Sequence, residues 1–189
     1  MQESTPDAPF EPRLAERFRT TYRLAKAPRT PNEFADFWRD RLDADPRMRE
    51  LFRRVRDGTA VIGETAANRG QVVFLPDGRK ANVMCGYDSL MTAVLRGRGS
   101  VHAACFHCGE RTEVHIEEGR SVRIMPETAV FWLGDGPRGI QVCDHLNLFP
   151  SLDHLAAWLR ADPEELGIAL SVPAAVELCS RMKGKASVP

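Results

Sequence analysis

The sequence predicts an α+β fold in which N-terminal helices precede a mostly antiparallel or mixed β core, followed by C-terminal helices. Three observations support this fold class. Residues 13–57 carry apolar side chains at helical spacing, residues 70–143 form short apolar runs separated by turns, and residues 151–182 return to a helical pattern. Because helices and strands are grouped along the chain instead of alternating, a doubly wound α/β sheet is disfavoured.

Length and composition limit the classes of protein that need to be considered. The chain has 189 residues, which suits one domain with a small N-terminal extension. Lys and Arg number 26 and Asp and Glu number 26, so the formal net charge is zero and no nucleic-acid partner is expected. No apolar run approaches the ~18 residues of a membrane span, and no signal peptide is evident. We therefore expect a cytoplasmic protein without a membrane partner.

Three regions are expected along the chain. Residues 1–12 contain three prolines and few apolar side chains, which is typical of a flexible tail. Residues 13–69 form an N-terminal helical region, and residues 70–189 form the main domain. Residues 10–57 carry 13 Lys and Arg against 9 Asp and Glu, a local net charge of +4. We interpret this charge as the solvated side of amphipathic helices, with a weak nucleic-acid surface as the alternative.

The helical region divides at its prolines. A first helix fits residues 13–26. The segment Thr30-Pro31-Asn32-Glu33 favours a second helix start, because threonine can cap a helix and proline suits its first position. Asp45-Pro46 predicts a third helix, which Asp57-Gly58 ends.

The main domain begins with a predicted hairpin. The turn signal Pro76-Asp77-Gly78-Arg79 lies between two apolar runs within residues 71–84. Further strands fit residues 100–105, 111–117, 121–125, 129–133 and 140–143. Helices fit residues 88–95, 151–159 and 172–182, with Ser151 and Pro173 at or near the starts of the last two.

Cysteine usage indicates where chemistry could occur. The chain has five cysteines: Cys85, Cys105, Cys108, Cys143 and Cys179. Because the number is odd and a cytoplasmic location is expected, a disulfide framework is disfavoured. The cysteines are then candidates for catalytic thiols or metal ligands. Cys179 lies in an apolar run of the last predicted helix, so we interpret it as a core residue.

Two pairs of residues combine a thiol with an acid. Cys85 ends the hairpin, and Asp88 opens the next helix, where the helix dipole would lower a thiol pKa and a carboxylate could hold a proton. Their structural alternative is a buried cysteine and a helix-capping aspartate. Cys143 precedes Asp144 and His145 at a predicted strand end. Its alternative is a buried cysteine beside a surface histidine.

A third group of residues is Cys105-Phe106-His107-Cys108-Gly109. A Cys-x-x-Cys-Gly turn is typical of a zinc knuckle, but structural zinc needs four ligands and the chain has no second Cys-x-x-Cys. The ligands that could complete the set are His102, His107 or Cys143. A redox pair, a metal relay and two ordinary thiols remain as alternatives.

The segment from Val83 to Met91 resembles the alkylmercury lyases (organomercurial lyases), which carry Cys-x-x-Asp-x-Leu-Met after a β-hairpin. Residues 101–105 resemble the strand of that family with an additional, non-catalytic cysteine. Residues 142–149 resemble the segment with the second catalytic cysteine. The resemblance covers roughly residues 70–182, and it rests on the ordered combination of these segments because no single motif is highly specific.

This resemblance implies an alkylmercury-lyase-like fold and a protonolysis of the carbon–mercury bond, from R–Hg⁺ to R–H and Hg²⁺. It implies that the Cys85 and Cys143 thiolates bind the metal and that Asp88 carries the proton. The Hg²⁺ product stays on the two cysteines until small thiols or a mercuric reductase remove it. No organic cofactor and no permanent catalytic metal are required.

An apolar wall for the organic group is expected from nearby hydrophobic residues. The candidates are Phe131, Trp132, Leu146 and Phe149, with ordinary core packing as the alternative for each. A dry pocket of this kind would raise the pKa of Asp88 and help it to carry a proton.

Two features depart from the family's pattern. The family's N-terminal region resembles a winged helix, whereas residues 13–57 predict helices without a wing. Cys108 turns the single Cys105 into a pair that could hold a structural Zn²⁺ or act as a secondary thiol site. Two alternative functions therefore stay open: an enzyme of this fold redirected to another substrate, and a non-enzymatic thiol protein that binds mercury, copper or zinc.

Overall fold

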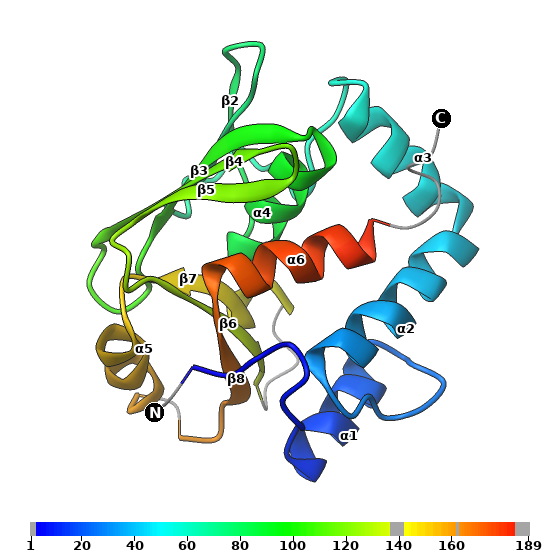
Figure 1. The fold of residues 1–189 in the computed structure, drawn as a ribbon, viewed down its shortest axis with the longest axis vertical. Helices are drawn as coiled ribbons and strands as arrows, with labels where there is room; N and C mark the ends of the chain where they lie inside the picture. The colour runs from blue at the N-terminus through cyan, green and yellow to red at the C-terminus, as the bar shows by residue number, and fades with distance from the viewer. Residues whose placement is uncertain (1–2, 137–141, 162, 184–189) are drawn as a thin grey trace.

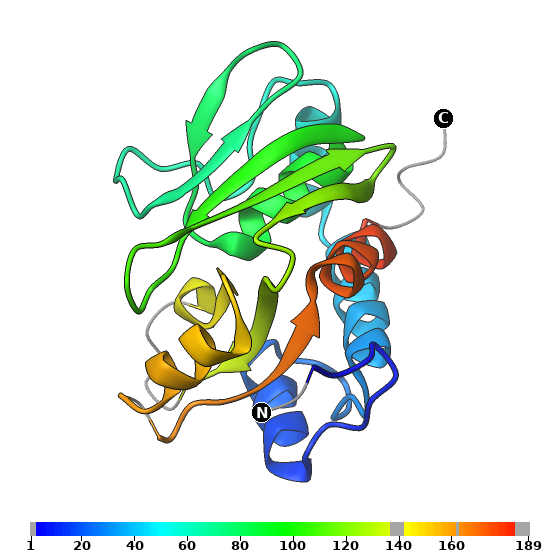
Figure 2. The same ribbon diagram turned by 60° about the vertical axis from the view of Figure 1, so that its left-hand side comes forward.

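Two antiparallel sheets organise the structure, a computed structural model that describes residues 3–136, 142–161 and 163–183. The larger sheet has the strand order β2-β1-β3-β4-β5, and the smaller sheet has the order β7-β6-β8. The larger sheet consists of β1 (Gln71–Phe74), β2 (Lys80–Asn82), β3 (Arg98–Ala104), β4 (Arg111–Glu117) and β5 (Arg120–Met125). The smaller sheet consists of β6 (Val130–Asp135), β7 (Leu146–Phe149) and β8 (Leu166–Ser171). Figures 1 and 2 show the larger sheet above the smaller one.

Three N-terminal helices lie along one side of the molecule (Figure 1). They are α1 (Pro12–Thr21), α2 (Pro31–Ala44) and α3 (Pro46–Arg56). The Thr30 side chain caps α2 by accepting a hydrogen bond from the Glu33 amide at 3.1 Å. The Asp45 side chain caps α3 by accepting one from the Arg47 amide at 2.8 Å. The predicted starts of both helices are therefore confirmed.

Two further helices join the sheets to the N-terminal region. Helix α4 (Gly86–Leu95) packs against β1 and β3, and nearly all of its residues are buried. Helix α6 (Val172–Met182) packs against α2, α4 and β5, below the larger sheet in Figure 2. A bidentate ion pair links α6 to α2: Arg181 donates hydrogen bonds of 2.8 and 2.6 Å to the two carboxylate oxygens of Asp36.

A second, smaller core lies between the smaller sheet and α5 (Leu152–Leu159). Its buried members are Cys105, Val130, Trp132, Phe149, Leu155 and Ala169. The Ser151 side chain caps α5 by accepting a hydrogen bond from the His154 amide at 3.4 Å, as the sequence predicts.

The residues before α1 make contacts with the rest of the protein. Residues 1–12 are expected to be a flexible tail, yet the Ser4 amide donates a hydrogen bond of 2.8 Å to the Ala169 carbonyl. The Phe10 amide donates another to Arg29, and its side chain is buried against Phe18 with ring centroids 5.1 Å apart. This segment therefore lies across β8 and α1 in the structure.

Two features of the C-terminal half differ from the sequence prediction. The strand expected at residues 140–143 is wrong at its described end, because Val142 and Cys143 lie in a short 3₁₀ helix, η1 (Val142–His145). The remainder of that expected strand lies outside the described residues. Strands β7 and β8 were not predicted. Both pair with β6, which is buried along its whole length, so tertiary pairing decides their conformation.

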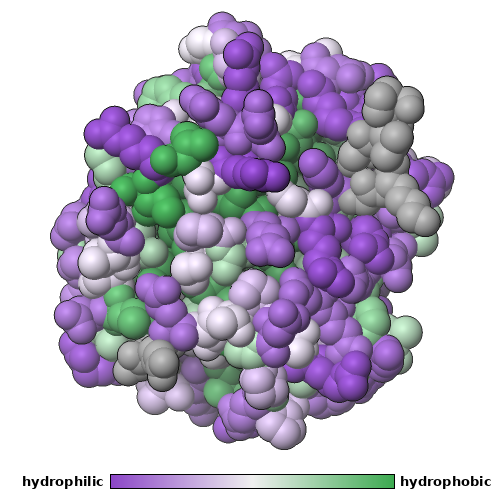
Figure 3. All heavy atoms as spheres, in the orientation of Figure 1, coloured by the Kyte–Doolittle hydropathy of each residue, from purple (hydrophilic) through white to green (hydrophobic). Residues whose placement is uncertain are grey.

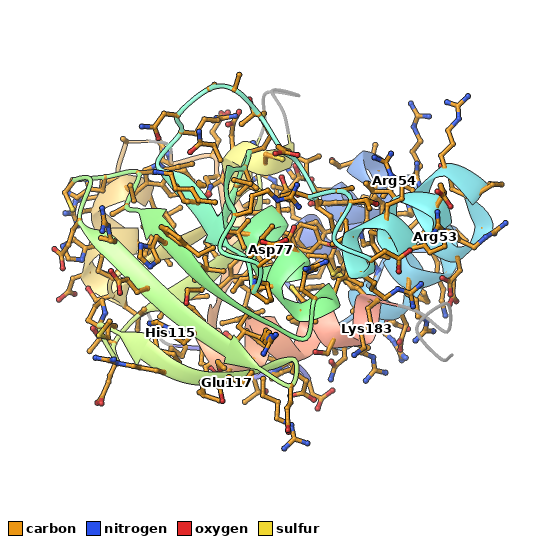
Figure 4. All side chains as sticks on the ribbon, turned by 90° about the horizontal axis from the view of Figure 1, so that it is seen from above. Arg53, Arg54, Asp77, His115, Glu117 and Lys183 are labelled. Carbon is orange, nitrogen blue, oxygen red and sulfur yellow. The ribbon has the colours of Figure 1, made fainter. Side chains whose placement is uncertain are left out.

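The outer surface is mostly hydrophilic on the face shown in Figure 3. On α3, Arg53 forms ion pairs with Glu50 and Asp57 at 2.6 and 2.7 Å, and all three side chains are exposed. Figure 4 shows Arg53 and Arg54 at the periphery of the N-terminal helices. These pairs agree with a solvated helix surface, the interpretation that the charge pattern favours. Among the described residues, no helix is both long enough and apolar enough to cross a membrane.

Candidate active site

Cys85 occupies the N-cap position of α4, directly after the hairpin, and is completely buried. The following residue is Gly86, where an added Cβ would lie 3.0 Å from the Leu148 nitrogen and 3.1 Å from the Asn147 Cα. The backbone of β7 therefore passes so close to the start of α4 that a side chain at this position would collide with it. This close approach brings β7 and η1 next to the Cys85 thiol.

Asp88 lies in the first turn of α4, and only 7% of its surface is exposed. Gly63 covers it on one side with a left-handed backbone (φ +61°), and a Cβ there would lie 2.1 Å from Asp88 Oδ2. Glycine therefore supplies both the backbone conformation and the space that the carboxyl group needs.

Cys143 comes from η1, far from the other two residues in the sequence. Its thiol donates a hydrogen bond of 3.6 Å to Asp88 Oδ2. The ligand atoms of Cys85, Asp88 and Cys143 all lie within 4.8 Å of one another. The fold thus gathers two thiols and one carboxyl group, contributed by the two segments that the sequence singles out.

Asn147 on β7 connects the two halves of this cluster. Its side-chain oxygen accepts a hydrogen bond of 3.3 Å from the Gly86 amide. Its amide group donates bonds of 3.3 and 3.2 Å to the carbonyls of Cys143 and Asp144. Asn147 is not among the site residues expected from the sequence. A lone amide inside the apolar run Leu-Asn-Leu-Phe is the feature that could have indicated its role.

Two ion pairs hold the outer side of η1. Arg69, from the segment before β1, bonds to Asp144. His145 Nδ1 lies 2.8 Å from Glu165 Oε2, and Glu165 accepts a hydrogen bond of 3.0 Å from the Trp132 indole. Burial opposes charge on His145, but the nearby Glu165 carboxylate raises the pKa of this histidine. Asp144 and His145 therefore support the turn that carries Cys143.

Burial is the main electrostatic influence on Cys85 and Asp88. Burial, reinforced by the neighbouring Cys143 and Asp88, raises the pKa of the Cys85 thiol well above its ordinary value. Burial also raises the pKa of Asp88, although hydrogen bonds from the two thiols act in the opposite direction. The expected lowering of the Cys85 pKa by the helix dipole is therefore wrong, because desolvation outweighs the dipole in this interior position.

An apolar cavity of about 280 Å³ opens next to the cluster, between the N-terminal helices and the core. Asp88 and Cys143 are among the residues that line it, whereas Cys85 lies behind them. The N-terminal helices and the residue that follows α1 contribute Tyr22, Phe34, Trp38 and Phe52. Four residues are expected to form an apolar wall. Phe131 and Leu146 do line the cavity, whereas Trp132 and Phe149 belong to the smaller core.

Two further residues of this cavity were not expected to take part. The Tyr22 hydroxyl is buried and has no hydrogen-bond partner among the described residues. Cys179, interpreted from the sequence as core, is buried but also lines the cavity. Burial raises the pKa of its thiol to about 12, so it stays a neutral thiol.

Cys105 and Cys108 lie apart from this cluster. Cys105 is buried and Cys108 is exposed. None of the expected partners completes their set: Cys143 belongs to the candidate active site, His107 is exposed, and the His102 ring packs on Phe74. The side chains that approach Cys108 are instead those of Glu110 and His154.

Comparison with known proteins agrees with this geometry. The family model for alkylmercury lyase, MerB, matches residues 66–184. No curated protein matches the chain. A solved structure, the crystal structure of the mercury-bound form of MerB2, is similar with a TM-score of 0.62 and 18% identity, covering 82% of this chain and 98% of that chain. The fold is therefore shared with MerB2, and the match over more than half of the sequence shows that this chain belongs to the alkylmercury lyase family.

Proposed function

We propose that the protein cleaves the carbon–mercury bond of organomercurials by protonolysis, with Cys85 and Cys143 as the sulfur ligands and Asp88 as the proton carrier. The observation that carries this proposal is the placement of two thiols and one carboxyl group within 4.8 Å of one another beside an apolar cavity. Thiolates are the natural ligands of a soft metal such as mercury.

The reaction begins at the accessible thiol. Cys143 is partly exposed and lines the cavity, so it exchanges with the small thiolate that accompanies R–Hg⁺ and releases that thiolate as a free thiol. The product of this step is R–Hg bonded to the Cys143 sulfur. Cys85, buried behind it, then attacks mercury and passes its proton to the Asp88 carboxylate.

The carbon–mercury bond is cleaved after the second sulfur has bound the metal. Donation from two thiolates weakens the carbon–mercury bond and places negative charge on the carbon. Asp88 returns its proton to that carbon, the bonding electrons stay with carbon in R–H, and Hg²⁺ remains on the two sulfurs. Because burial raises the pKa of Asp88, its carboxylate takes up the Cys85 proton more readily than an exposed aspartate would, and the proton is then available for this step.

The cavity fits the organic group of the substrate. Its aromatic and aliphatic walls exclude water, which would otherwise hydrate the reacting groups. The N-terminal helices provide one wall, so we assign them the role of covering the substrate. Two small thiols of the cytoplasm then exchange with the Cys85 and Cys143 sulfurs and carry Hg²⁺ away. A mercuric reductase is the alternative acceptor of the ion.

The contact between Asp88 and Cys143 favours a lyase over a simple metal carrier. A carrier needs only the thiols, whereas a buried carboxyl group that accepts a hydrogen bond from a thiol is suited to moving a proton. The same contact does not select mercury over another substrate, so the test must measure the hydrocarbon product.

The test is the release of benzene from phenylmercury in the presence of excess small thiol. The wild-type protein is expected to complete many turnovers, and Cys85→Ser and Cys143→Ser are expected to abolish them. Val122→Ser changes an exposed side chain of β5, outside the site, and serves as the control, which is expected to retain turnover. Stoichiometric mercury binding without benzene release would refute the lyase and favour a carrier.

A further inference from the structure

A second group of metal-ligating side chains lies on the surface, away from the candidate active site. The ligand atoms of Cys108, Glu110 and His154 all lie within 4.8 Å of one another. Cys105 lies in the same turn, three residues before Cys108, and its carbonyl accepts a hydrogen bond from the Gly109 amide. We propose that Cys105, Cys108 and His154 bind a structural Zn²⁺ ion, with Glu110 or a water molecule at the fourth position.

The turn that carries the two cysteines is shaped to hold a metal. The Cys105 amide donates a hydrogen bond of 2.8 Å to the Glu110 carbonyl, and the Gly109 amide donates one of 2.8 Å to the Cys105 carbonyl. Gly109 closes the turn with a left-handed backbone (φ +79°). A Cys-x-x-Cys-Gly turn of this shape is how a zinc knuckle presents two thiolates.

His154 is presented to this turn by the first turn of α5. Its Nδ1 lies 3.3 Å from the Ser151 hydroxyl, which also accepts a hydrogen bond from the His154 amide. Its Nε2 faces Glu110, with 3.5 Å between Nε2 and Oε2. A histidine that is anchored through one ring nitrogen and offers the other is the usual arrangement of a metal ligand.

The donor set selects the metal. Two thiolates, one imidazole and one carboxylate match the sulfur, nitrogen and oxygen ligands that zinc binds tetrahedrally. Mercury(II) would need only the two thiolates, so His154 and Glu110 would have no role in a mercury site. Because the Glu110 side chain is half exposed, it can turn towards the ion or leave the position to water.

The place of this group in the fold explains what the ion would do. Cys105 directly follows β3 of the larger sheet, whereas His154 belongs to α5, which packs on β7 of the smaller sheet. The buried Cys105 side chain is part of the smaller core together with Leu155 of α5. A bound zinc would therefore join the end of β3 to α5, beside the smaller core.

The experiment measures zinc in protein purified without a metal-affinity tag. Wild-type protein and Cys143→Ser are each expected to contain about one zinc per chain, and Cys108→Ser and His154→Gln to contain almost none. His107→Gln is the matched control, because it changes an exposed histidine of the same turn and should retain the ion. Replacement of zinc by Co²⁺ should give a thiolate-to-cobalt charge-transfer band in wild type that Cys108→Ser lacks.

Thermal unfolding tests the structural role separately from metal content. A strong chelator is expected to lower the unfolding temperature of the wild-type protein and to leave that of Cys108→Ser unchanged. Zinc that is lost in Cys143→Ser but kept in Cys108→Ser would overturn the proposal, because it would place the ion in the candidate active site. Wild-type protein that takes up no zinc, or that joins Cys105 and Cys108 in a disulfide, would overturn it as well.

Discussion

The two cysteine clusters use similar residue types in opposite environments. Cys85, Asp88 and Cys143 are brought together from distant segments, and burial raises the pKa of Cys85 and that of Asp88. The Cys105–Cys108 turn is local and reaches the surface, and its neighbours include an imidazole and an exposed carboxylate. Under the two proposals, the dry interior suits proton transfer between thiol, carboxyl and carbon, whereas the surface turn suits a permanently held cation.

The largest effect is expected from Asp88, the buried carboxyl group beside the two thiols. Asp88→Asn keeps the shape of the side chain but cannot accept and return a proton, so turnover of phenylmercury should fall by about 10²-fold or more. Binding of Hg²⁺ by the two thiols should persist. Both are measured on the same preparation, by benzene release and by mercury titration.

Asp144→Asn is the matched control for this change, since Asp144 neighbours Cys143 in the sequence but bonds to Arg69. Its turnover is expected to stay within about tenfold of wild type, because the loss of a partly exposed ion pair costs little. Equal losses of turnover in the two variants would contradict a specific role of Asp88 in proton transfer.

The next effect concerns the close approach that assembles the buried cluster. Gly86→Ala would insert a Cβ 3.0 Å from the backbone of β7, and we expect a loss of about 1–3 kcal/mol in the free energy of unfolding. Turnover should fall as well, because Cys85 and η1 would be pushed apart. Denaturant unfolding and benzene release measure the two effects.

Gly78→Ala provides the comparison for Gly86. At Gly78 an added Cβ would meet no atom of the described residues within 4 Å, and only the left-handed backbone (φ +82°) is strained. This variant should lose about 1 kcal/mol and keep its turnover, since the hairpin tip is remote from the site. A Gly86 variant that behaves like this one would refute the packing argument.

Asn147→Ala should lower both stability and turnover, because the Gly86 amide and the carbonyls of Cys143 and Asp144 would lose their partner inside the protein. The expected cost is about 1–3 kcal/mol in the free energy of unfolding. If Asn147 acts by positioning the thiols, mercury affinity should fall together with kcat. Unchanged mercury affinity would mean that Asn147 is structural only.

The sequence was informative wherever the signal was local. The caps at Thr30 and Asp45, the hairpin before Cys85 and the pairing of Cys85 with Asp88 on one helical turn follow from neighbouring residues. The sequence predicts a strand at Cys143, where the structure has a 3₁₀ helix. The local pattern does not show that the Asn147 side chain bonds to the backbone of this helix.

The partners of the surface turn could not be predicted for a related reason. Glu110 is close in the sequence, but His154 arrives from α5, and its position depends on how the smaller core packs. Spacing therefore identified which residues carry chemistry, and tertiary packing decided which of them meet.

The pH dependence of stability offers a smaller test of the buried cluster. Because the pKa of Asp88 is raised in the folded protein, its stabilising contribution is complete below the pKa of an unfolded aspartate, about 3.9, and is lost as the pH rises through the folded pKa. Wild-type protein should therefore lose stability relative to Asp88→Asn over that range. The free energy of unfolding of both proteins is compared at each pH, which cancels the other titrating groups. A difference that grows in the opposite direction would mean that Asp88 is stabilised as a carboxylate.

The smallest effect is expected at Tyr22, where the cavity of the buried cluster contains a hydroxyl without a partner among the described residues. Tyr22→Phe removes a polar group that has lost its hydration, so the free energy of unfolding should rise by up to about 1 kcal/mol. Benzene release should stay close to wild type, because the aromatic ring remains in the cavity wall against Phe18 and Phe34. If stability rises while turnover falls, the hydroxyl contacts the substrate or the mercury-bound sulfurs. The apolar wall would then contribute a polar contact as well as excluding water.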